Sequence, residues 1–175
     1  MPKYIITGGP GAGKTTLLEG LRQCRYPCYA EASRQLIIEE KEKGSDCLPW
    51  INLHGFAQKV LQRMSHDFDT ALSAPITFFD RGIPDIIAYL QAAGLPVEEI
   101  YHKTAEKLRY APRVFLLPPW QDIYVQDDER WQTFEEAKIL DGRLRSAYLH
   151  AGYRVVELPL TTIQDRIRFI QNRLQ

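Results

Sequence analysis

Residues 8–15 restrict the possible folds of this chain more than any other feature, because they read Gly-Gly-Pro-Gly-Ala-Gly-Lys-Thr. The octapeptide matches the pattern G-x-x-x-x-G-K-[ST], in which a glycine-rich loop joins a buried strand to a helix and surrounds phosphate with backbone N–H groups. The flanking residues agree, since the apolar run 4–6 precedes the loop and a leucine-striped segment, 17–21, follows it. Four fixed positions match by chance in only about one percent of chains of this length.

Each position of this loop has a predicted chemical task. The glycines let backbone N–H groups turn toward phosphate oxygens, and the helix N-terminus that follows favours negative charge. We expect Lys14 to bind the β- and γ-phosphates, Thr15 to ligate Mg²⁺ and Thr16 to reach the α-phosphate. A plain strand-to-helix turn would explain the glycines but not the Lys-Thr pair. The predicted cofactors are ATP and Mg²⁺, and the predicted nucleotide-binding residues are Gly9, Pro10, Gly11, Ala12, Gly13, Lys14, Thr15 and Thr16.

A second acidic residue is needed to hold the magnesium ion, and Asp80 is the candidate. It directly follows the β-branched and aromatic run 76–79, which predicts a strand. An aspartate at a strand end is also common as a cap of a turn or helix, and this alternative stays open. The next residue is Arg81, not the glutamate with which motor-type ATPases polarise water, so the sequence favours charge stabilisation near a phosphoryl acceptor.

The rest of the chain alternates short strands with helical segments. Extended runs are predicted at 4–6, 26–29, 76–79, 114–117 and 153–158. Helical spacing or capping residues mark 31–43, 56–64, 83–90, 97–110, 133–150 and a last segment capped by Thr161 with Gln164. Strands separated by helices need parallel crossovers, so we predict the α/β class, with a parallel sheet covered on both faces and a single domain over 1–175.

Composition excludes several classes of protein. The 22 Lys and Arg residues balance 22 Asp and Glu residues, so no global field attracts nucleic acid or an anionic membrane. No run approaches the roughly 20 apolar residues of a membrane helix, and no signal-peptide apolar region develops before Gly8. The three cysteines are too few for a disulfide framework or a four-ligand zinc site. We therefore expect a cytoplasmic protein with buried, reduced thiols.

Three further segments carry a family resemblance: Glu-Ala-Ser-Arg at 31–34, Phe-Asp-Arg-Gly-Ile-Pro-Asp at 79–85, and the acidic-then-Arg stretch 127–130. With the glycine loop, the chain resembles over its full length a small P-loop kinase-like family of predicted ATPases, an AAA domain type related to the ribosylnicotinamide kinase domain of NadR. The resemblance implies the three-layer P-loop NTPase fold and the strand order 2-3-1-4-5.

The same resemblance implies an acceptor site and a lid. Glu31 would accept the proton of the acceptor hydroxyl, while Arg34 and Arg81 would hold the substrate. Arg130, in a lid-like segment at about 120–132, would neutralise charge on the transferring phosphoryl group. Glu31 could instead be a helix-start residue favoured by the helix dipole, and Arg130 a surface partner of its acidic neighbours. Pro159 would lie near the nucleotide base, and Trp120 and Trp131 flank the lid.

These patterns lead to one functional hypothesis and one alternative. The first is an ATP- and Mg²⁺-dependent kinase that phosphorylates a nucleoside-like or other hydroxylated small molecule, with Lys14, Arg81 and Arg130 making one strongly positive cleft. The alternative is a nucleotide-dependent switch that hydrolyses ATP or GTP without a small-molecule acceptor. The chain has no Asn-Lys-x-Asp motif for reading guanine, which favours ATP. No motif names the acceptor.

Overall fold

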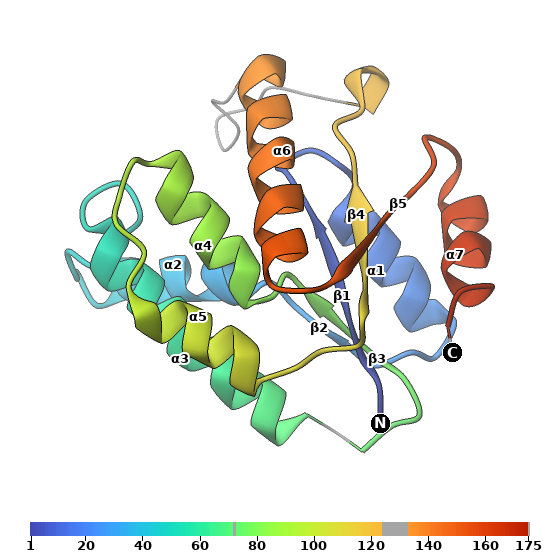
Figure 1. Cartoon of the computed structure of the whole chain (residues 1–175), viewed down its shortest axis with the longest axis horizontal. Helices are drawn as coiled ribbons and strands as arrows, with labels where there is room; N and C mark the ends of the chain where they lie inside the picture. The colour runs from blue at the N-terminus through green and yellow to red at the C-terminus, as the bar shows by residue number, and fades with distance from the viewer. Residues whose placement is uncertain (72, 124–132, 175) are drawn as a thin grey trace.

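The computed structural model describes residues 1–71, 73–123 and 133–174, and their strands form a five-stranded parallel sheet (Figure 1). The sheet order is β2-β3-β1-β4-β5, so the predicted α/β class and the order implied by the family resemblance are both confirmed. The strands are β1 (Lys3–Gly8), β2 (Cys28–Tyr29), β3 (Thr77–Asp80), β4 (Arg113–Leu117) and β5 (Arg154–Glu157).

The central strand β1 sets the position of the functional loops. Its neighbours are β3 and β4, with Ile6 opposite Asp80 and Gly8 opposite Leu117. The carboxyl ends of the three strands therefore lie at the same edge of the sheet. In open parallel sheets ligands bind at this edge, and here it carries the glycine-rich loop and the residues that follow β3.

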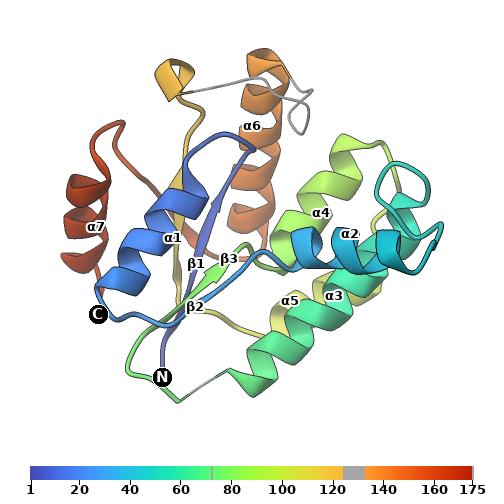
Figure 2. The same ribbon diagram turned by 180° about the vertical axis from the view of Figure 1, so that it is seen from behind.

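Helices cover both faces of the sheet. Figures 1 and 2 show α1 and α7 together on one face and α4 and α6 on the other, where α2, α3 and α5 extend the layer. The helices are α1 (Lys14–Gln23), α2 (Ala32–Glu42), α3 (Leu53–Thr70), α4 (Ile83–Ala92), α5 (Glu99–Lys107), α6 (Phe134–His150) and α7 (Ile163–Gln171), with a short 3₁₀ turn at Gln121–Ile123. No helix among the described residues has both the length and the apolar character to cross a membrane.

Alternation along β1 explains the two halves of the core. Tyr4 and Ile6 belong to an apolar cluster with Leu18 of α1 and Ile170 of α7. Ile5, between them in sequence, packs in another cluster with Tyr148 of α6. Successive side chains of a strand point to opposite faces, so this short run is buried on both sides, as a central parallel strand requires.

The structure differs from the sequence predictions at several element ends and at the cysteines. Helix α5 ends at Lys107 instead of 110, because the N–H of Ala111 already bonds to Lys3 of β1. Helix α7 is capped by Thr162, whose hydroxyl accepts from the N–H of Asp165, and not by Thr161 with Gln164. The expected burial of the thiols is wrong, since Cys24 is exposed just after the last turn of α1 and the other two cysteines are half-buried.

Candidate active site

The glycine-rich loop lies between β1 and α1, as predicted. Gly11 and Gly13 have φ angles of 76° and 88°, in the left-handed region that favours glycine. Gly13 is also the N-cap of α1 and has no side chain with which to cap the first turn. The first N–H groups of α1 are thus left for another acceptor, and an anion satisfies such groups well.

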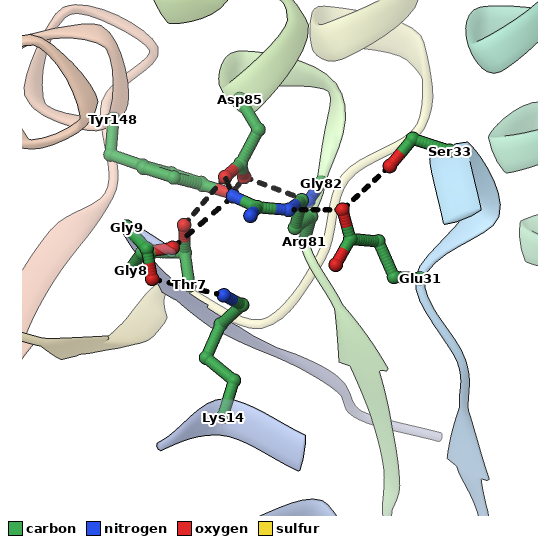
Figure 3. Close-up of polar contacts among 10 residues, drawn as sticks. All are labelled: Thr7, Gly8, Gly9, Lys14, Glu31, Ser33, Arg81, Gly82, Asp85 and Tyr148. Atoms are coloured by element: carbon green, nitrogen blue, oxygen red, sulfur yellow. Dashed lines mark hydrogen bonds and ion pairs between the residues drawn. The ribbon is translucent and has the colours of Figure 1, made fainter. Parts of the chain in front are cut away.

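Lys14 is the first residue of α1, and its side chain lies over the loop. It is buried, and its Nζ donates to the carbonyl of Gly9 at 3.3 Å (Figure 3). Burial lowers the pKa of Lys14, and the nearby Arg81 lowers it further, although three surrounding carboxylates oppose both effects. The next two residues, Thr15 and Thr16, are exposed to solvent at the start of the helix.

Asp80 ends β3 beside the loop, and its carboxylate lacks a complete set of partners. Among the described residues no hydrogen-bond donor reaches its buried Oδ1 atom. Burial raises the pKa of Asp80 to about 6, against the opposing effects of Lys14 and Arg81. A buried carboxylate oxygen without a donor is well suited to a cation, so the donor chemistry fits the predicted magnesium ligand.

Arg81 follows β3 in a left-handed backbone conformation, with φ at 73°, and its N–H bonds to the carbonyl of Ile6 at 2.9 Å. Its buried guanidinium is held by protein groups. Nε lies 3.0 Å from Oε1 of Glu31, and Nη1 donates to Asp85 at 3.1 Å and to the Gly8 carbonyl at 3.2 Å (Figure 3). Burial lowers the pKa of Arg81, but these carboxylates raise it well above its usual value.

Glu31 is the N-cap residue of α2 and lies just after β2, the strand next to β3. Ser33 donates to its Oε1 at 2.6 Å. Burial raises the pKa of the Glu31 carboxyl, but Arg81 and Lys14 outweigh burial and bring the pKa down to about 2. Glu31 is therefore ionised at neutral pH and lies beside the glycine-rich loop (Figure 3).

The other predicted residues divide into those that are described and those that are not. Arg34 is exposed on α2. Arg130 and Trp131, with residues 124–132 of the predicted lid segment, lie outside the described residues. Trp120 is half-exposed, and its ring lies 5.0 Å from the guanidinium carbon of Arg166. The carbonyl of Pro159 accepts from Nε of that same arginine.

The sequence predicted no role for Thr7, Asp85 or Tyr148, which the structure brings together next to the Arg81 guanidinium (Figure 3). The signal available for Asp85 was its i+4 spacing from Arg81 at the start of a helix. The contact of Tyr148 spans 63 residues, and no local pattern predicts it.

The expected strongly positive cleft is not what the described residues form. Three carboxylates lie close enough to interact electrostatically with both Lys14 and Arg81. They belong to Glu31, Asp80 and Asp85. The charge of Arg81 is already compensated by two of them.

Comparison with known proteins identifies the family of this chain. A sequence model described as AAA domain matches residues 3–166. The chain belongs to this AAA domain family. No curated protein matches its sequence.

Solved structures similar to this AAA domain protein share its P-loop kinase-like fold. The NadR protein in complex with NR superposes with a TM-score of 0.74 at 19% identity, over 98% of this chain and 50% of that one. Deoxyadenosine kinase from M. mycoides with bound dATP gives 0.62 at 15% identity, over 98% of each chain. Shikimate kinase from Acinetobacter baumannii in complex with shikimate gives 0.56 at 16% identity, over 100% of this chain and 96% of that one.

Proposed function

We propose that this AAA domain protein is an ATP- and magnesium-dependent kinase that transfers the γ-phosphoryl group to a hydroxyl of a nucleoside-like metabolite. The observation that carries the proposal is the position of Glu31. The ionised carboxylate of Glu31, just after β2, pairs with Arg81 beside the glycine-rich loop. An acceptor hydroxyl would have to lie at this place to reach the γ-phosphate. A deoxyadenosine kinase and a shikimate kinase share the fold, which supports a hydroxylated small molecule as acceptor.

The nucleotide half of the site follows from the loop. Residues 9–16 other than Pro10 provide backbone N–H groups, and Thr15 and Thr16 add their hydroxyls. Lys14 would leave the Gly9 carbonyl to bind the β- and γ-phosphates. Arg130 is proposed to neutralise charge from the lid segment.

Magnesium fits the chain at the edge between β1 and β3. Asp80, with its donor-free buried oxygen, and the exposed hydroxyl of Thr15 are proposed to hold the ion. Mg²⁺ keeps several waters and binds substrate phosphates, which would supply its other ligands. When bound, the ion would supply neutralisation of phosphate charge.

The remaining residues position the acceptor for transfer. The acceptor oxygen forms a bond to the γ-phosphorus while the bond from that phosphorus to the β,γ-bridging oxygen breaks, and ADP leaves. The hydroxyl proton passes to the carboxylate of Glu31 and then to solvent. A carboxylate with a pKa of about 2 is a weak base, so Glu31 acts chiefly by orienting the hydroxyl, with Arg81 keeping it ionised and Arg34 contacting the substrate.

ADP release with and without acceptors tests this function. The purified protein is mixed with ATP and Mg²⁺, alone or with nucleosides, ribosides and shikimate-like polyols, and phosphorylated product is identified by mass spectrometry. We expect at least one compound to raise ADP release tenfold or more and to gain one phosphoryl group. Hydrolysis of ATP at the same rate with every compound would contradict the kinase assignment and favour a nucleotide-dependent switch.

A further inference from the structure

The carboxylate of Asp85 is buried, and both of its oxygens accept hydrogen bonds. It is 2% exposed, and its Oδ1 accepts from the hydroxyl of Thr7 at 2.6 Å and from Nη1 of Arg81 at 3.1 Å. Its Oδ2 accepts from the N–H of Gly82 at 3.0 Å and from the hydroxyl of Tyr148. Four donors from β1, the β3–α4 segment and α6 thus converge on one carboxylate (Figure 3).

Arg81 needs such support for two reasons. Its left-handed backbone is uncommon for a residue with a long side chain and persists only where the surroundings hold it. A buried guanidinium also has many torsions to fix, and its orientation decides which nitrogen faces Glu31. Asp85 holds Nη1 at 3.1 Å, while Nε lies 3.0 Å from Oε1 of Glu31 as an ion pair.

From this arrangement, and resting on the proposed function, we propose that Asp85 is a positioning residue of the phosphoryl-acceptor site. It acts through Arg81, whose Nη1 it holds while Nε lies beside Glu31, and Thr7 donates to the same Asp85 oxygen, Oδ1, that Arg81 contacts. The guanidinium of Arg81 also donates to the carbonyl of Gly8. The orientation of Arg81, and with it that of Glu31, is therefore coupled to the beginning of the glycine-rich loop.

A role limited to starting α4 would need only one of these contacts. The bond from the Gly82 N–H to Oδ2 caps the helix, and an amide oxygen at the same place would preserve it. The amide nitrogen introduced by Asp85→Asn would then face Nη1 of Arg81, two donors opposed to each other. This substitution therefore separates helix capping from the positioning of Arg81.

Tyr148→Phe is the matched control, because it removes a donor from Oδ2 of Asp85 and leaves Oδ1, the oxygen that Arg81 and Thr7 contact, with both of its donors. In Asp85→Asn we expect hydrogen exchange of the Nη1–H groups of Arg81, whose acceptor is Asp85, to accelerate at least tenfold, as followed by NMR with assignment from Arg81→Lys. The kcat/KM for the best nucleoside of the panel should fall at least 100-fold, while the Kd for ATP changes less than threefold. Tyr148→Phe should stay within threefold of wild type in all three measurements.

Exchange and kcat/KM in Asp85→Asn within threefold of wild type would overturn the proposal. If Asp85→Asn does not fold, the isosteric Thr7→Val decides, with exchange at Arg81 expected to rise at least threefold and an unchanged rate counting against the proposal. If wild-type protein phosphorylates no compound, the proposed function fails, and the NMR measurement still tests the positioning of Arg81 on its own.

Discussion

Nε of Arg81 lies 3.0 Å from Oε1 of Glu31, and this ion pair joins the end of β3 to the beginning of α2. The arginine is 7% exposed and the glutamate 24%. In so little water the two charges depend on each other, because loss of either one removes an ion-pair partner from a buried charge, although Arg81 also pairs with Asp85. The pair therefore links the stability of the fold to the acceptor side of the site.

The first prediction concerns Glu31→Gln and pH. The pKa of Glu31 is lowered from 4.5 to about 2 in the folded protein, so the folded state favours the ionised form. The resulting stabilisation is present above the unfolded pKa and is lost as pH falls through the folded pKa. At pH 7 we expect Glu31→Gln to lower the free energy of unfolding by about 3 kcal/mol, and the difference should shrink between pH 5 and pH 2, measured by urea unfolding.

Glu99→Gln is the control, since Glu99 is 78% exposed and pairs with Lys103 on the surface. Its effect should stay below about 0.5 kcal/mol at every pH. A difference between Glu31→Gln and wild type that does not vary with pH would count against the buried pair.

The second prediction concerns ATP binding. Lys14→Ala removes the buried ammonium next to the loop. Charge-assisted contacts to phosphate are strong, so the Kd for Mg-ATP, measured by calorimetry, should rise at least about 100-fold, or roughly 2.7 kcal/mol. Lys103→Ala, on the exposed face of α5, should leave the Kd unchanged. Equal ATP affinity in both variants would refute the nucleotide site.

The architecture was readable from the sequence because its signals are local. A β-branched run, a glycine loop with Lys14 and a helical stripe each depend on neighbouring residues, and the capping box of Thr133 and Glu136 is present as predicted. The strand order came from the family resemblance. The end of α5 was missed because its stop depends on a bond from Ala111 to β1, which is distant in sequence.

The site was readable only in part, and for the same reason. Lys14, Glu31 and Asp80 lie at the sheet edge where strand ends predict them. The pairing of Arg81 with Glu31 could not be anticipated, because it joins segments distant in sequence, whereas its pairing with Asp85 had a local signal in the i+4 spacing. Spacing predicts which edge a residue occupies, whereas the direction of a long side chain depends on tertiary packing.

The third prediction tests the close packing behind Arg81. A Cβ on Gly82 would lie 2.5 Å from Cδ1 of Ile5 and 3.1 Å from the hydroxyl of Tyr148. The φ of Gly82 is −139°, which any residue adopts, so the cost of Gly82→Ala is steric. We expect a loss of roughly 1–3 kcal/mol in chemical unfolding.

Ile5→Val removes the nearer of these two atoms and provides the double-mutant test. The combined variant should be about 1 kcal/mol more stable than the sum of the two single effects. If the two changes in unfolding free energy are strictly additive, the steric clash of Gly82→Ala is not with Ile5.

The last prediction concerns Arg166, which connects α7 to the nucleotide loop. Its fully buried guanidinium donates through Nε to the carbonyl of Pro159 at 2.9 Å and through Nη1 to the carbonyl of Ala12 at 3.3 Å. Arg166→Leu would leave both carbonyls without this donor, at a cost of about 2–4 kcal/mol in unfolding free energy. Because Ala12 lies in the loop, the Kd for Mg-ATP should also rise, by about tenfold. Arg168→Leu, on the same helix but 74% exposed, should change neither quantity, and equal effects of the two variants would mean that helix α7 acts on the loop without Arg166.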